Sequence, residues 1–99
     1  MLEHLTQKSL SEQLNTKFRL SSEAGQSVEL ELVEVTDDGD AAGQTARFSA
    51  LFRGPLEQFF QQRTYSMEHE QLGSLELFIV PVRKDAEGFY YEAVFNRVN

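Results

Sequence analysis

The sequence contains no cysteine and no tryptophan, and only two of its 99 residues are proline. The lack of cysteine excludes disulfide scaffolds, thiolate zinc sites and thiol catalysis, and it fits a reducing compartment. Long hydrophobic runs are also missing. The longest strongly apolar run, from Leu75 to Val82, is interrupted by Glu76 and Pro81 and is far shorter than the roughly 20 residues of a membrane helix. We therefore expect a soluble chain.

Basic residues are scarce, because nine Lys and Arg stand against sixteen Asp and Glu, which gives a formal net charge of -7. An acidic surface repels phosphate backbones and anionic lipid headgroups, so we expect neither a nucleic-acid partner nor a membrane partner. The first ten residues, MLEHLTQKSL, have neither the basic region nor the apolar region of a secretory signal. Together with the lack of cysteine, this predicts a cytoplasmic localisation.

Apolar residues are plentiful enough for one compact domain spanning residues 1–99. Hydrophobic residues make up 40% of the chain, with eight Phe and three Tyr, and the length is that of a common single domain. At the start, Leu10 and Leu14 are four positions apart, and Asn15 is a residue that can end a helix in the left-handed conformation. The sequence therefore predicts a helix over about residues 6–15.

The rest of the chain, about residues 17–97, alternates apolar and polar side chains in the manner of antiparallel strands. The alternation slips at Leu32 and Val33, which predicts a β-bulge there. The apolar parity of these strands also predicts a set of side chains that are buried together. They are Val28, Leu30, Leu32, Phe48, Phe52, Leu75, Leu77, Ile79, Phe89 and Phe95.

Two segments in the second half depart from simple alternation. The Gly54-Pro55 break is expected to begin a short helical turn that runs through Phe60. The segment 75–82 is apolar at both parities, so we expect it to form a central strand that is covered on both faces. One helix followed by about six strands predicts a mainly β fold, a small antiparallel six-stranded barrel or roll with one N-terminal helix.

Catalytic and metal-binding patterns are weak in this sequence. The only two histidines are His4 and His69, and adjacent residues of a strand, as in Glu68-His69-Glu70, point to opposite faces. We therefore expect His69 to make a structural hydrogen bond at the end of a hairpin arm. The acidic segment 37–40 lacks the ligand spacing of a calcium loop. No catalytic residue, no metal ligand and no cofactor is predicted.

Two surface features are candidates for binding a partner. Glu29, Glu31 and Glu34 form an acidic stripe, and Glu29 and Glu31 in particular could meet a basic partner, although a charged outer face is also what any half-exposed strand shows. Phe59 and Phe60 lie in a connection between strands, where apolar side chains are otherwise not needed.

The apolar outer positions Phe78, Val80 and Val82 also need a cover. We expect the N-terminal helix to lie over Phe78 and Val80. Val82, with Tyr90 at the rim, would then join Phe59 or Phe60 in an exposed patch for self-association or for a partner.

Six short strings carry a resemblance to a known family. They are LEHLT at 2–6, FRL at 18–20, LELVEV at 30–35, LFRGP at 51–55, LGSLELFIVPV at 72–82 and YEAVFN at 91–96. Read together, they resemble a family of uncharacterised bacterial domains of about 100 residues, and the likeness spans nearly the whole chain. Members of that family are often encoded near fibre proteins with phage-tail-collar domains. The resemblance therefore implies an accessory, assembly or capping role and supplies no catalytic residues.

These observations predict a non-enzymatic protein-binding module that acts as an accessory, capping or chaperone-like partner of a bacterial fibre or phage-tail-like assembly. Its partner would be a fibre or tail-like protein, or a second copy of the chain. The alternatives are a small barrel that binds an apolar ligand and, less favoured, a hydrolase-type enzyme. A partner protein recovered from a native lysate would support the first function, and an apolar ligand retained through purification would support the second.

Overall fold

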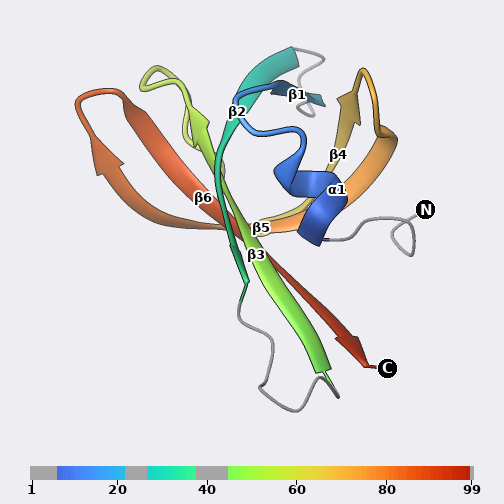
Figure 1. Ribbon diagram of the computed structural model, residues 1–99. Coiled ribbons are helices and arrows are strands. Elements are labelled where there is room, and N and C mark those ends of the chain that lie inside the picture. Colours follow the sequence, from blue (N-terminus) through green and yellow to red (C-terminus); the bar gives the residue numbers. More distant parts are fainter. Residues whose placement is uncertain (1–6, 22–26, 38–44, 99) are drawn as a thin grey trace.

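The computed structural model describes residues 7–21, 27–37 and 45–98 (Figure 1). The elements of these residues are the helix α1 (Gln7–Ser11) and the strands β1 (Lys17–Ser21), β2 (Ser27–Asp37), β3 (Thr45–Gly54), β4 (Arg63–His69), β5 (Gly73–Asp85) and β6 (Gly88–Val98). Paired strands run antiparallel, and the sheet closes on itself in the order β1-β2-β3-β6-β5-β4. The predicted mainly β fold is thus confirmed as a closed six-stranded barrel with one short N-terminal helix.

The interior of the barrel is filled by the side chains that alternation places on its inner face. The buried cluster consists of Leu10, Phe18, Leu20, Leu30, Leu32, Phe48, Ala50, Phe52, Phe60, Met67, Leu75, Leu77, Ile79, Tyr91 and Ala93. Of the predicted core, Val28, Phe89 and Phe95 are only partly buried and pack against this cluster, and the other members belong to it. The inward parity inferred from the sequence is therefore confirmed.

The N-terminal helix is shorter than the predicted range 6–15, because α1 ends at Ser11. After it the chain tightens, and the Gln13 N–H donates to the Leu10 carbonyl at 2.9 Å. Asn15 then adopts a φ of 69°, the left-handed conformation expected of it, and its N–H donates to the carbonyl of Leu32 in β2 at 2.7 Å. This bond to β2 takes the place of further helical bonds and stops the helix early.

The expected cover of Phe78 and Val80 by the helix is wrong. α1 packs against β2 and β3, and it buries Leu10 in the core of the barrel. Leu14, the second residue of the expected apolar stripe, lies beyond the helix and is exposed. In the described residues, no helix has the length and the apolar character needed to cross a membrane.

The predicted bulge is confirmed, because the register of β2 against β3 shifts between Leu32 and Glu34. The expectation of a central strand covered on both faces over 75–82 is wrong. In a closed barrel β5 has one inner and one outer face, and Phe78 and Val82 are exposed on the surface. The expected helical turn after Pro55 is reduced to a turn at residues 56–57. Of the acidic segment 37–40, residues 38–40 lie outside the described residues.

Candidate functional site

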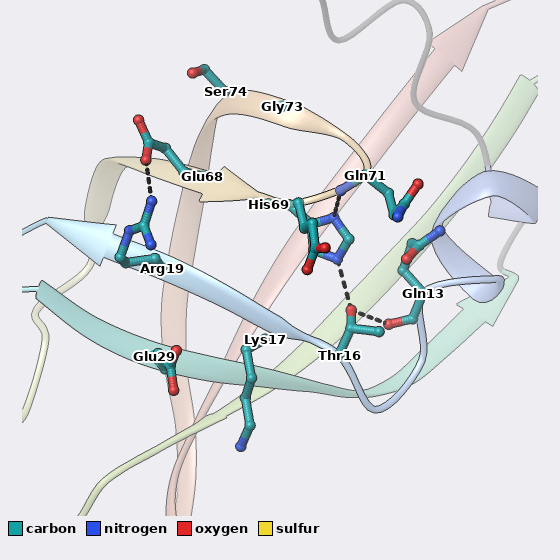
Figure 2. Close-up of a pocket in the computed structure, with 11 residues that line it drawn as sticks. Gln13, Thr16, Lys17, Arg19, Glu29, Glu68, His69, Gln71, Gly73 and Ser74 are labelled. Carbon is teal, nitrogen blue, oxygen red and sulfur yellow. Dashed lines mark hydrogen bonds and ion pairs between the residues drawn. The ribbon is translucent and has the colours of Figure 1, made fainter.

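A polar hollow of about 750 Å³ opens beside the hairpin of β4 and β5 (Figure 2). Gln13 and Thr16 line it from the turn after α1, Lys17 and Arg19 from β1, and the hairpin lines it from the other side. The hollow forms because β1 and β4 close the barrel over only two residue pairs, Arg19↔Glu68 and Leu20↔Met67. Beyond these pairs the two strands leave a space between them.

His69 lies at the wall of this hollow with both ring nitrogens engaged. Its Nδ1 accepts the backbone N–H of Gln71 at 3.0 Å and that of Leu72 at 3.1 Å, so this nitrogen carries no proton. Nε2 therefore bears the hydrogen of the neutral ring and donates it to Thr16 Oγ1 at 2.7 Å. The Thr16 hydroxyl in turn donates to the carbonyl of Gln13 at 2.6 Å (Figure 2). The structural hydrogen bond predicted at His69 is confirmed.

The direction of this chain decides what Thr16 and His69 can do chemically. In a nucleophile and base pair, the imidazole nitrogen beside the hydroxyl must accept its proton, while the other nitrogen donates to an orienting group. Here the far nitrogen of His69 faces two N–H donors, so the near nitrogen is the protonated one. The hydrogen bond between His69 and Thr16 connects the start of β1 to the β4–β5 hairpin. The proton of this bond comes from His69, whereas in a catalytic dyad it would come from the hydroxyl group.

Burial lowers the pKa of His69 below its usual value, and the nearby carboxylate of Glu70 opposes this effect. His69 is 6% exposed, and its ring lies against Phe18, with 4.4 Å between the ring centroids. A second proton would have to enter at Nδ1, where two backbone N–H groups already point. His69 is therefore held neutral by its surroundings.

The charged groups around the hollow include one ion pair between two of its lining residues. Arg19 and Glu68 form an ion pair at 2.6 Å between side chains that are both more than half exposed (Figure 2). Such exposed pairs contribute little to stability, about 0–1 kcal/mol. In the described part of the chain, no three His, Asp or Glu side chains come together as a group that could hold a metal ion.

The two acidic candidates from the sequence differ in their surroundings. Glu29 is exposed on β2 and lines the polar hollow. Glu31, two residues further along β2, forms ion pairs with Arg53 at 2.7 Å and with Lys17 at 3.5 Å. Of these two glutamates, Glu29 is exposed and Glu31 is half-buried by its ion pairs.

The aromatic pair in the connection between β3 and β4 is divided between surface and core. Phe59 is 51% exposed, and its ring meets Phe89 edge-on at 5.1 Å. Phe60 is buried and belongs to the core cluster, so of the two phenylalanines only Phe59 is exposed for a partner. The backbone N–H of Phe60 donates to the hydroxyl of Tyr91 at 3.0 Å, and its ring packs against Tyr65.

Val82 and Tyr90 are separated by a shift of register between Pro81 and Arg83. The shift places Arg83 opposite Tyr90 in the paired strands, and its guanidinium lies 4.2 Å from the centre of the tyrosine ring. Tyr90 is therefore buried on the outer face, and the expectation of an exposed rim residue is wrong. Val82, the extra residue of the bulge, is exposed as expected.

The sequence did not predict a further surface, which lies where β5 and β6 separate (Figure 1). Their pairing ends at Val80↔Glu92, so in the described structure residues 73–79 of β5 pair only with β4 and residues 93–98 of β6 pair only with β3. A gap of about 320 Å³ lies between the two edges, lined among others by Phe78 and Val94. We call it the β5–β6 seam and define it by Glu76, Leu77, Phe78, Ala93 and Val94.

The signal that could have identified the seam was partly present in the sequence. Phe78 and Val94 are 51% and 43% exposed, and both occupy outward positions where a polar residue is the norm. The sequence indicated that Phe78 points outward, but we expected the helix to cover it. Val94 was not identified.

Comparison with known proteins gives one finding. A family model described as a domain of unknown function (DUF6916) matches residues 5–95. No curated protein and no solved structure matches the chain.

Proposed function

We propose, from the premise that the chain belongs to the DUF6916 family of domains of unknown function, that this protein is a non-enzymatic protein-binding module. Its role would be that of an accessory, capping or chaperone-like partner of a bacterial fibre or phage-tail-like assembly. The assembly is inferred from the resemblance of the sequence to domains encoded near such fibre proteins. The binding role is inferred from the surface of the barrel.

The observation that carries the binding role is the β5–β6 seam. Phe78 and Val94 expose apolar side chains at a place where two strand edges have no strand partner in the described structure. Protein partners recognise exposed apolar side chains beside free strand edges, and monomeric proteins usually cover such edges.

Two further observations favour a binding module over the alternatives. The core side chains fill the interior of the barrel, which leaves the apolar-ligand alternative without a supporting feature. The histidine of the polar hollow is engaged at both ring nitrogens in structural hydrogen bonds, which speaks against a role as general base. We therefore retain protein binding as the single proposed function.

The test is affinity capture from a native lysate of the source organism, with the retained proteins identified by mass spectrometry. Phe78→Ser and Phe59→Ser form a matched pair of variants, because both phenylalanines are 51% exposed. We expect the wild type and Phe59→Ser to retain a fibre or tail-like protein and Phe78→Ser to lose it. Absence of any such protein from the wild-type capture would refute the assembly role, and equal retention by both variants would refute the seam as its binding surface.

A further inference from the structure

The free edge of β5 at the seam has the features of a site for strand addition. On the side away from β4, residues 73–79 have no strand partner in the described structure, so alternate backbone N–H and C=O groups there are open to another chain. At about 3.3 Å per residue, the edge from Gly73 to Ile79 extends for about 20 Å. This length is enough for five to seven residues of an extended segment, roughly the length of a common strand.

Side chains of alternating character border this edge. On the outer face, Glu76 and Phe78 are exposed and lie two residues apart, and Val94 borders the gap from β6. On the inner face, the neighbours across the gap are Leu77 and Ala93, which are both buried and apolar. An added strand would therefore need an apolar residue beside Phe78, a small apolar residue facing inward, and a third residue beside Glu76.

The charge of the seam selects the chemistry of that third residue. Glu76 lies on the border of the seam, and Glu92, opposite Val80 on the outer face, lies where the pairing of β5 with β6 ends. The described ion pairs join Lys17 and Arg53 to Glu31, Arg19 to Glu68, and Arg53 to Glu87, and they use neither Glu76 nor Glu92. A cation on the added strand beside Glu76 would meet its carboxylate, and the net charge of -7 would attract a basic partner over longer distances.

We propose that the β5–β6 seam binds an extended segment of a partner protein as an added strand on β5, with a basic and an apolar side chain alternating on its outer face. This inference rests on the proposed function and names the chemistry of its partner. A second copy of the chain is the poorer occupant, because it would bring two acidic surfaces together.

The test uses a synthetic acetylated and amidated heptapeptide, Ser-Lys-Val-Leu-Val-Lys-Ser, and the full chain. Its lysines and leucine share one face of a strand, and the symmetric pattern presents the same face in either direction. We expect saturable binding in a fluorescence titration that weakens as salt is added. Hydrogen exchange of the complex should show new protection of alternate amides within residues 73–79.

Three controls separate the features of the site. A peptide with N-methyl groups on its valines and leucine keeps the side chains but loses backbone donors, so its binding should be lost. Glu76→Lys and Glu57→Lys change the net charge equally, and both glutamates are exposed. Only Glu76→Lys should weaken binding, by about tenfold, and Phe78→Ser should weaken it by a similar factor.

The outcomes distinguish the two proposals. Equal binding of the N-methylated peptide, equal effects of the two charge reversals, or protection outside residues 73–79 would overturn strand addition. If the peptide fails to bind while Phe78→Ser loses a captured fibre or tail-like protein, strand addition is refuted and the proposed function stands. If the free protein proves to be a dimer that Phe78→Ser dissociates, the occupant is a second copy and the inference is wrong.

Discussion

His69 makes the stability of this fold dependent on pH in a direction that the structure fixes. Its folded-state pKa is lowered by burial, whereas the unfolded chain titrates near the reference value of about 6.5. Between these two pKa values, the unfolded chain binds a proton that the folded chain does not. The full contribution to stability is therefore present above pH 6.5, and it is lost as the pH falls from 6.5 through the folded pKa.

The size of the effect has an upper bound. For a group that stays neutral in the folded state, one pH unit below the unfolded pKa costs about 1.4 kcal/mol of unfolding free energy, which corresponds to about 6–11 °C in Tm for a domain of this size. Carboxylates also titrate on acidification, so the effect of His69 must be isolated against a variant that lacks it.

His69→Asn is the variant suited to this purpose. In the β5–β6 turn of the same chain, the Asp85 carboxylate Oδ1 accepts the N–H groups two and three residues on, from Glu87 at 2.8 Å and Gly88 at 3.2 Å. An asparagine at position 69 can hold the β4–β5 turn in the same way, while it loses the bond to Thr16. We expect it to be less stable than the wild type at pH 7.5 by about 1–3 kcal/mol.

The measurement is urea unfolding of both proteins at pH 7.5, 6.5 and 5.5. The difference in stability between them should shrink by up to about 1.4 kcal/mol at pH 5.5, because only the wild type loses the contribution of a neutral histidine. Parallel stability curves over this range would refute the account of His69, and a difference that grows on acidification would reverse the sign of its pKa shift.

Three further substitutions test the packing of the barrel. Tyr91→Phe removes the acceptor of the buried Phe60 N–H and should cost about 1–3 kcal/mol in urea unfolding, and a change below 0.5 kcal/mol would contradict the role of that bond. Leu77→Ala, at a fully enclosed position, should cost about 2–5 kcal/mol, and a melting temperature within two degrees of wild type would show that the inward register is wrong. Gly88→Ala should prevent stable folding, because a Cβ there would overlap the carbonyl oxygen of Gly54 in the neighbouring strand, and a soluble variant with unchanged circular dichroism would refute this.

The sequence predicted the features that depend on local spacing. The slip of alternation after Leu32 was sufficient to place the bulge, and the left-handed conformation of Asn15 followed from its position after an apolar pair. Which side chains face inward also followed, because parity within a strand is a local property. The ten residues predicted to face inward therefore all lie in or against the core, although the prediction used no knowledge of the strand order.

Features that depend on the strand order were not recoverable in this way. Tyr90 is covered because its neighbours across the sheet are Arg53 of β3 and Arg83 of β5, the latter brought opposite it by the shift at Pro81. Phe60 is buried because it packs against Tyr65 and against Tyr91, which is distant in sequence. The seam likewise requires that β6 pair with β3 along its length and with β5 for only part of it. Each of these is a tertiary relation between segments that single-sequence periodicity does not contain.

The narrow closure between β1 and β4 has a consequence for how the chain folds. The contacts that close the barrel join residues far apart in sequence, 49 positions for Arg19 and Glu68 and 53 for Thr16 and His69. Forming them requires a large loss of chain entropy in return for few contacts, whereas the hairpins β4–β5 and β5–β6 form from neighbouring segments. Closure should therefore follow the rate-limiting step of folding. Weakening it, as in Thr16→Ala, should accelerate unfolding and leave the refolding rate nearly unchanged.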